Sequence, residues 1–228
     1  MDEIKLNNIY CMDCLEGMKN LEDNSVDCVI TDPPYNINLK PQRRINKSID
    51  NDNLSNKEFK TMLNGWFQQI DRVLKNDSFL IIFVGWSTIP DFREVLDKYF
   101  FLKSMPIWVK NNFGIGYYTR PQYEPLMLYL KGKPPVLKNP ISDVMKFNKV
   151  LKPVHSCEKP VMLIKHLVNS FSKKNEIVLD PFMGSGTTAV AAKELGRNFI
   201  GFELDDEYCK IAEERIKKVV KNKSLFDF

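Results

Sequence analysis

The stretch Ile177-Val-Leu-Asp180-Pro-Phe-Met-Gly184-Ser-Gly186-Thr-Thr188 decides the fold class of this chain. It is an apolar strand that runs into a glycine turn and then into a helical segment, AVAAKEL. Four of the ten glycines of the chain lie between Gly184 and Gly201, which is typical of a backbone that approaches a ligand closely. A second apolar strand, Phe199–Phe202, follows and ends at Glu203. The segment therefore predicts a strand–turn–helix–strand unit of an α/β fold.

The same segment indicates which kind of cofactor the fold would bind. Glu203 follows Asp180 by about 20 residues, the spacing at which an acidic side chain accepts hydrogen bonds from ribose hydroxyls. The loop is not a P-loop, because no lysine follows Gly186, and Ala189 replaces the third glycine of the dinucleotide fingerprint. A carboxylate at Asp180 suits an ammonium group and repels a pyrophosphate. The pattern thus favours a nucleoside joined to an amino acid over a nicotinamide dinucleotide.

A second motif, Val29-Ile-Thr-Asp32-Pro33-Pro34-Tyr35-Asn36, also stands at the end of an apolar strand. The two prolines remove two N–H donors and fix the backbone, so that carbonyl oxygens project. With the Asp32 carboxylate before them and the Tyr35 ring after them, this corner can accept two hydrogen bonds from an amino group and stack on a flat ring. An isolated Asp-Pro-Pro is usually only a rigid turn, but its place after a buried strand favours the binding interpretation.

The rest of the chain fits an α/β fold with a largely parallel sheet, because apolar strands alternate with helical patterns. No repeat, low-complexity tract or linker divides the 228 residues, so we expect a single domain, 1–228. An antiparallel pair, Phe101–Val109 with Pro125–Leu130, is expected at one edge of the sheet. The other expected strands are Asn8–Met12, Val26–Thr31 and Phe79–Val84. Helices are expected over residues 59–74, 161–171 and 211–220. Ser55 and Glu58 are expected to cap the first of these helices and Asp205 the last.

Composition excludes several classes of protein. The chain is 43% hydrophobic and 27% charged, which is too apolar for a disordered protein, and its longest apolar run, Phe79–Val84, is far shorter than a membrane span. The N-terminal MDEIKLNN is not a signal peptide, so we expect a cytoplasmic protein. Five scattered cysteines argue against a disulfide framework, and the CxxC at Cys11 and Cys14 lacks partners for a zinc site. We therefore expect no metal.

Two stretches do not follow the alternation of strands and helices. Residues 36–53 form a polar segment with Lys40, Arg43, Arg44 and Lys47 close together, and residues 131–153 hold four prolines and little periodicity. Both could be plain solvated loops. Their length instead favours a functional or mobile segment.

The two motifs together resemble those of the amino-methyltransferases of DNA, which transfer a methyl group from S-adenosylmethionine to an exocyclic base nitrogen. Asp32-Pro-Pro-Tyr35 matches their catalytic motif, and Asp180-Pro-Phe-Met-Gly-Ser-Gly186 matches their cofactor loop. The order of the motifs is similar to that of the circularly permuted beta class, and the resemblance extends from residue 8 to about 217. It implies a Rossmann-like methyltransferase fold with a mostly parallel sheet, and a bacterial, archaeal or phage gene.

The resemblance implies a role for each matching residue. Asp13 would accept from the adenine amino group of the cofactor, Glu203 would hold its ribose hydroxyls, and Lys159 would lie near its methionine carboxylate. Asp32 and the Pro33 carbonyl would accept from the target amino group, with Tyr35 stacked on the base. The implied sets are Asp32, Pro33, Pro34 and Tyr35 for catalysis, and Asp13, Cys14, Lys159, Asp180, Phe182, Gly184, Ser185, Gly186, Thr187, Glu203 and Leu204 for S-adenosylmethionine.

Double-stranded DNA is the implied partner, with the target base flipped out of the helix. The aspartate of the catalytic motif favours N6 of adenine, with N4 of cytosine as the alternative. We expect Lys40, Arg43, Arg44 and Lys47 to contact DNA phosphates, and residues 131–153 to be a short target-recognition insert. A homodimer and a cognate restriction endonuclease are further expectations. Two other readings of the sequence are a nicotinamide-dependent oxidoreductase, which leaves the catalytic motif unexplained, and a nucleic-acid-binding module without activity.

Overall fold

The computed structural model describes residues 4–37, 53–151, 153–154 and 157–224. In this described part, nine strands form one sheet in the order β1-β9-β8-β2-β3-β6-β5-β7, with β4 beside β6. The first five strands of that order run parallel, whereas β6 is antiparallel to β3, β4 and β5. The strands are β1 Asn8–Cys11, β2 Val26–Thr31, β3 Leu74–Phe83, β4 Phe101–Ser104, β5 Ile107–Val109, β6 Tyr123–Lys131, β7 Val144–Lys146, β8 Ile177–Asp180 and β9 Asn198–Glu203.

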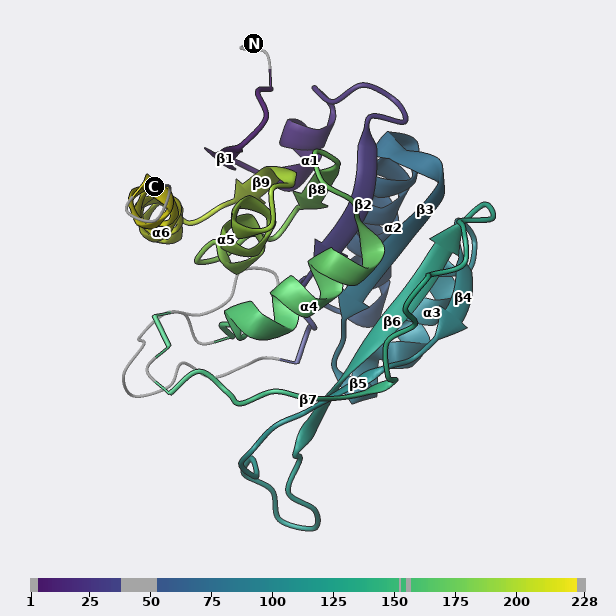
Figure 1. Ribbon diagram of the computed structural model, residues 1–228. Helices are drawn as coiled ribbons and strands as arrows, with labels where there is room; N and C mark the ends of the chain where they lie inside the picture. Colours follow the sequence, from purple (N-terminus) through teal and green to yellow (C-terminus); the bar gives the residue numbers. More distant parts are fainter. Residues whose placement is uncertain (1–3, 38–52, 152, 155–156, 225–228) are drawn as a thin grey trace.

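Helices cover both faces of the sheet (Figure 1). Helices α1, α2 and α3 pack on one face around a buried cluster that includes Phe67 and Phe92. Helices α4, α5 and α6 pack on the other face around a second cluster, which includes Phe171 and Ala191. The helices are α1 Cys14–Met18, α2 Asn56–Val73, α3 Ile89–Leu96, α4 Val161–Phe171, α5 Thr187–Glu194 and α6 Asp206–Ser224, with a 3-10 turn at Trp86–Thr88. The predicted α/β class with a largely parallel sheet is confirmed.

Both helix caps that the sequence predicted, Ser55 with Glu58 and Asp205, are present in the structure. The Ser55 hydroxyl accepts from the Glu58 N–H at 3.3 Å, and the Glu58 carboxylate accepts from the Ser55 N–H at 3.0 Å, so α2 begins with a capping box. At the start of α6, Asp205 Oδ1 accepts from the N–H groups of Glu207 and Tyr208 at 2.9 and 3.3 Å. Helices α1 and α3, of five and eight residues, were not predicted; α5 is as short as α3 but was predicted from the strand and glycine turn that precede it.

The antiparallel edge differs from the prediction in its arrangement. Residues 101–109 are divided into β4 and β5, and both pair with the same edge of β6, whose other edge pairs with β3. Strand β6 therefore lies inside the sheet. The segment 131–153 is also more ordered than expected, since β7 pairs with β5 and buries Met145. A three-residue strand leaves too little periodicity in the sequence to be recognised.

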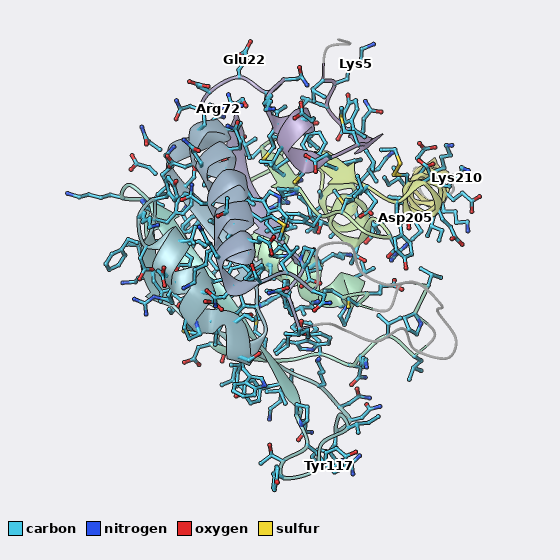
Figure 2. The ribbon with its side chains drawn as sticks, turned by 180° about the vertical axis from the view of Figure 1, so that it is seen from behind. Lys5, Glu22, Arg72, Tyr117, Asp205 and Lys210 are labelled. Atoms are coloured by element: carbon cyan, nitrogen blue, oxygen red, sulfur yellow. A yellow bond between two sulfur atoms is a disulfide. The ribbon has the colours of Figure 1, made fainter. Side chains whose placement is uncertain are left out.

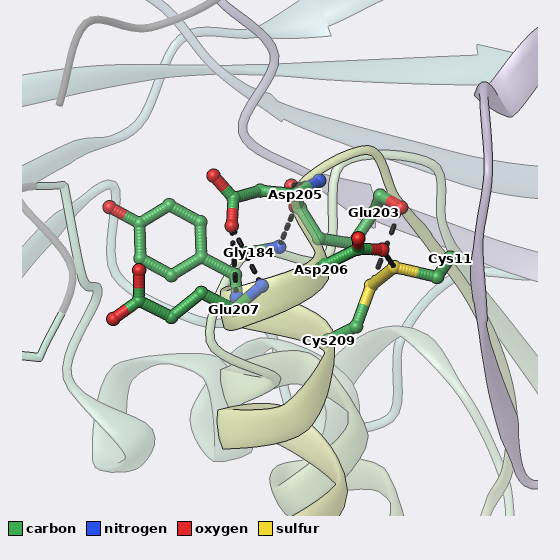
Figure 3. Close-up of a disulfide and its surroundings, with 8 residues drawn as sticks. Cys11, Gly184, Glu203, Asp205, Asp206, Glu207 and Cys209 are labelled. Carbon is green, nitrogen blue, oxygen red and sulfur yellow. Dashed lines mark hydrogen bonds between the residues drawn. A yellow bond between two sulfur atoms is a disulfide. The ribbon is translucent and has the colours of Figure 1, made fainter.

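A disulfide joins Cys11 and Cys209, although the five scattered cysteines argued against a disulfide framework (Figure 3). The Cα atoms of the two residues are 5.9 Å apart, although 198 positions separate them in the sequence. They meet because β1 pairs with β9 and α6 follows β9 directly. The positions of the two cysteines in the sequence therefore do not predict that they pair.

The parallel part of the sheet determines where a site can form. Strands β1, β9, β8, β2 and β3 all end at the same edge, and ligands of open α/β sheets bind outside the carboxyl ends of the strands. No helix in the described residues is long and apolar enough to cross a membrane.

Candidate active site

One cavity of about 520 Å³ lies outside the carboxyl ends of the parallel strands. The loops after β1, β8 and β9 contribute Asp13, Gly184 and Leu204 to its lining. Asp32 after β2, Trp86 after β3, and the beginning of β6 line it as well. The catalytic motif and the cofactor loop, which lie almost 150 positions apart in the sequence, therefore share one cavity.

The glycine turn of the cofactor loop is fixed to the tip of β9. Gly186 has a φ of +84°, and a Cβ there would lie 2.7 Å from the Cβ of Ala212, so that both conformation and packing require glycine. The Gly184 N–H donates to Glu203 Oε2 at 2.7 Å, and the Asp205 N–H donates to Glu203 Oε1 at 2.9 Å (Figure 3). Burial raises the pKa of Glu203 above its ordinary value. Glu203, which was expected to hold the ribose, thus also orders the backbone at Gly184 and Asp205.

Asp180 is buried at the end of β8, and both of its oxygens accept hydrogen bonds. The hydroxyls of Thr31 and Thr188 donate to it at 2.8 and 2.7 Å, and the Phe182 N–H donates at 3.1 Å. Burial raises the pKa of Asp180 to about 6, although the hydrogen bonds from Thr188, Thr31 and Phe182 oppose the shift. The carboxylate therefore links β8 to β2 and α5 within the cavity wall.

The raised pKa of Asp180 predicts a pH dependence of stability. Between about pH 4 and pH 6 the folded protein holds a proton on Asp180 that the unfolded chain has released, so this residue's contribution to the free energy of unfolding falls as the pH rises. The amide of Asp180→Asn cannot titrate. We expect the stability of the wild type relative to this variant to fall by roughly 2 kcal/mol between pH 4.5 and pH 7.5. Urea unfolding at both pH values measures it, and parallel curves would contradict the assignment.

The other predicted cofactor residues line the same cavity as the glycine turn. Asp13 caps α1 through Oδ1, which accepts from the N–H groups of Leu15 and Glu16 at 2.8 and 3.3 Å. Cys14 is buried, and burial raises the pKa of its thiol, so it remains protonated. The Phe182 ring packs edge-on against Trp66, with ring centroids 4.5 Å apart. Phe182, Ser185, Thr187 and Leu204 all line the cavity.

Arg215 of α6 is a residue that the sequence did not single out. Its guanidinium donates to the carbonyl and hydroxyl oxygens of Ser185 at 2.9 and 2.7 Å, and it pairs with Glu158 at 3.0 Å. The arginine therefore ties the cofactor loop to the segment that precedes α4. Its helical position resembled that of an ordinary surface charge, so nothing in the sequence marked it.

The catalytic corner holds Asp32 and Tyr35 beside a second carboxylate. The Tyr35 hydroxyl donates to Asp32 Oδ1 and lies 2.9 Å from Glu124 Oε1. Gly85 follows β3 and packs against the ring, since a Cβ there would lie 3.3 Å from Tyr35. Pro33 and Pro34 line the cavity between these side chains. Trp86 also lines the cavity, and the residue is 72% exposed.

Lys159 occupies this corner as well. Its ammonium group pairs with Asp32 and, at 3.0 Å, with Glu124 Oε1, and only 8% of its side chain is exposed. Lys110 pairs with the other oxygen of Glu124 at 2.9 Å. We expected Lys159 near the methionine carboxylate of the cofactor. The structure pairs it with carboxylates of the protein instead, and the cofactor contact stays a prediction.

The pKa values of the two carboxylates are shifted in opposite directions, because burial prevails at Asp32 and the neighbouring lysines prevail at Glu124. Burial raises the pKa of Asp32 above its ordinary value, an effect that Lys159 opposes and the charge of Glu124 reinforces. Burial also acts to raise the pKa of Glu124, but Lys159 and Lys110 overcome it and lower this pKa to about 2. Glu124 is therefore ionised throughout the neutral range. The sequence motifs assigned no role to Lys110 or Glu124.

The predicted DNA-binding residues Lys40, Arg43, Arg44 and Lys47 lie outside the described residues. Within the described part, no group of three or more His, Cys, Asp or Glu side chains is placed to hold a metal ion.

The fold and the site define a class of α/β protein in which a glycine turn with acidic neighbours, suited to a nucleoside, lines the same cavity as the Asp32-Pro-Pro-Tyr35 corner. A family described as DNA methylase (N6_N4_Mtase) matches residues 26–214. The type II methyltransferase M.HpaI of Haemophilus parainfluenzae is 30% identical over 239 residues, which cover 91% of this chain and 73% of that protein. This chain belongs to the N6/N4 DNA methylase family, as the sequence motifs implied.

Solved structures agree with this assignment. The M1.HpyAVI–SAM complex superposes with a TM-score of 0.70 at 29% identity, over 91% of this chain and 98% of that chain. The cytosine-N4-specific PvuII DNA methyltransferase has a TM-score of 0.75 at 16% identity, over 93% of this chain and 89% of that chain, and it therefore shows a common fold. The comparisons confirm the family and the methyltransferase fold, and they leave the choice between adenine and cytosine to the chemistry of the site.

Proposed function

We propose that this protein transfers a methyl group from S-adenosylmethionine to the N6 amino group of an adenine flipped out of double-stranded DNA. One observation carries the proposal: the Asp32 corner and the 180–187 loop line the same cavity. A methyl donor held by the loop and an amino group held by the corner would therefore meet.

The residues present fit the proposed cofactor. Acidic side chains follow three neighbouring strands, as Asp13 after β1, Asp180 at the end of β8 and Glu203 at the end of β9. Carboxylates suit ribose hydroxyls, an adenine amino group and an ammonium group, all of which S-adenosylmethionine carries. When bound, the cofactor supplies a methyl group activated by a sulfonium.

Asp32 and the Pro33 carbonyl activate the acceptor in this account. The amino nitrogen of adenine is a poor nucleophile, because its lone pair is delocalised into the ring. Two acceptors on its hydrogens orient that lone pair toward the methyl group and offset the positive charge that develops on the nitrogen. When the N–C bond has formed and the S–C bond has broken, the nitrogen gives up one proton, for which Asp32 is the adjacent acceptor.

Adenine is proposed over cytosine because aspartate opens the catalytic motif. Expression in a host without endogenous DNA methylation, followed by single-molecule sequencing that detects modified bases, tests this choice. The expected result is N6-methyladenine in one short sequence. N4-methylcytosine in a defined sequence would retain the mechanism and overturn the choice of base.

The hairpin between β5 and β6 supports a macromolecular acceptor. Ile115, Tyr117 and Tyr118 are almost fully exposed on it, and Figure 2 shows Tyr117 at the tip, well away from the body of the protein. The strand that leaves this hairpin carries Tyr123 and Glu124 into the cavity lining. Large apolar and aromatic side chains that are exposed together on one hairpin favour a binding surface over a solvated loop.

The basic segment that follows the catalytic motif is proposed to contact DNA phosphates. Replacing Arg43 and Arg44 with alanine removes two charges, so we expect the slope of log affinity against log salt to become shallower by about 2. Fluorescence anisotropy with a duplex between 50 and 300 mM salt measures this slope. An unchanged slope would show that the arginines do not reach the backbone of the DNA.

The wider arrangement also belongs to the proposal. We propose one domain that acts on DNA in the cytoplasm, with residues 131–153 as a short target-recognition insert. So small an insert favours a short recognition sequence or the help of a second subunit, and hence a homodimer. M.HpaI is a type II methyltransferase, which supports a cognate restriction endonuclease in the same cell.

A further inference from the structure

We propose that Glu124 is a positioning residue of the active site, which keeps Lys159 and Tyr35 in place while Asp32 releases them to accept the amino group of the target base. The inference rests on the proposed function and adds to it a residue with a defined task.

The geometry that carries this inference is one shared oxygen atom. In the described part of the chain, the Asp32 carboxylate has two side-chain partners, Tyr35 on Oδ1 and Lys159 on Oδ2. Both partners also lie within hydrogen-bonding distance of Glu124 Oε1, Tyr35 at 2.9 Å and Lys159 at 3.0 Å. Each group that occupies Asp32 therefore has a second acceptor already in place.

The target amino group needs the oxygens that these partners hold. For Asp32 to accept a hydrogen from the base, Lys159 or Tyr35 must yield its place on the carboxylate. Lys159 is the critical group, because an ammonium whose side chain is 8% exposed cannot lose its counter-charge without a large penalty. Glu124 provides that counter-charge, so Asp32 can exchange the lysine for the base.

The hairpin strands hold Glu124 in position for this task. Glu124 pairs with Trp108 in the ladder between β6 and β5. Lys110, which directly follows β5, pairs with Glu124 Oε2 at 2.9 Å and leaves Oε1 toward the catalytic corner. Two carboxylates and two ammonium groups thus balance in charge across the cluster.

The first test is Glu124→Gln in the full chain, assayed with S-adenosylmethionine and duplex DNA. A neutral amide leaves Asp32 as the one carboxylate paired with Lys159 among the described residues. Lys159 then stays on Asp32 Oδ2, which can no longer accept from the target base. We expect kcat to fall about 10- to 100-fold, with cofactor affinity within twofold of the wild type. Glu94→Gln is the matched control, since it removes a surface pair with Lys60 and is expected to leave kcat unchanged.

A second substitution separates positioning from a general structural role. In Glu124→Gln/Lys159→Met the lysine that blocks Asp32 is gone, so we expect kcat to recover at least fivefold relative to Glu124→Gln alone. Glu124→Asp keeps the charge and is expected to retain more activity than the amide variant. If Glu124→Gln is too unstable to assay, the kcat of Glu124→Asp is compared with those of the wild type and Lys159→Met. The kcat of Glu124→Asp is then expected to lie below that of the wild type and above zero.

The outcomes are distinguishable. Wild-type kcat in Glu124→Gln, or losses in the double variant that multiply instead of cancelling, would overturn the role of Glu124. An inactive wild type that binds cofactor and DNA would instead contradict the proposed function.

Discussion

Asp32→Ala is expected to lower the rate of methyl transfer to DNA by about 10²-fold or more while S-adenosylmethionine still binds. The substitution removes the carboxylate that would accept from the target amino group, and it leaves in place the hydrogen bond between Gly184 after β8 and Glu203 at the end of β9. Single-turnover transfer under saturating cofactor and DNA measures the rate. Calorimetric titration measures the affinity for the cofactor.

Asp32→Asn is the matched control for this experiment. It keeps the shape of the side chain and one carbonyl oxygen but loses the charge that pairs with Lys159. We expect a rate between those of Asp32→Ala and the wild type. Wild-type turnover in the alanine variant would exclude Asp32 from the chemistry and with it the assignment of the catalytic corner.

Glu203→Ala is expected to weaken S-adenosylmethionine binding roughly 10²-fold, because charge-assisted hydrogen bonds contribute about 1.5–3 kcal/mol each. Glu203 would accept from the ribose hydroxyls, and it also holds the N–H groups of Gly184 and Asp205. Its loss removes both a ligand contact and the order of the turn. Binding of DNA without cofactor is expected to change little, since the catalytic corner follows β2, which β8 separates from β9 in the sheet.

Glu213→Ala is the control for Glu203→Ala, because Glu213 lies on the surface of α6 and pairs only with Lys217 among its described contacts. It is expected to bind S-adenosylmethionine as the wild type does. Equal cofactor affinity in Glu203→Ala and the wild type would show that the nucleoside does not bind at the tip of β9. Thermal unfolding of each variant checks that a loss of binding is not a loss of fold.

The parts of this protein that the sequence predicts are those in which local pattern and local chemistry coincide. The run 177–188 contains its strand, its glycine turn and the start of its helix in twelve consecutive residues, and the structure shows β8, the turn and α5 there. The capping box of Ser55 and Glu58 is equally local. Such features depend on residues that are close together in the sequence, so the local sequence pattern is enough to predict them.

The parts that the sequence does not predict depend on contacts between distant segments. Glu124 and Lys159 meet at the catalytic corner only because β6 and the segment before α4 approach the same edge of the sheet. Cys11 and Cys209 meet through the pairing of β1 with β9. The family resemblance assigned Lys159 to the cofactor. Its pairing with Asp32 and Glu124 is apparent only from the three-dimensional structure.

Identification of the methylated base tests most directly whether this cavity transfers a methyl group to an amino group of DNA. The purified protein is incubated with S-adenosylmethionine and unmethylated DNA, and the DNA is digested to nucleosides for mass spectrometry. We expect N6-methyldeoxyadenosine to form with the wild type and to be almost absent with Asp32→Ala. A wild-type protein that binds the cofactor and leaves every base of the DNA unmodified would contradict the central claim that this cavity joins a methyl donor to a DNA amino group.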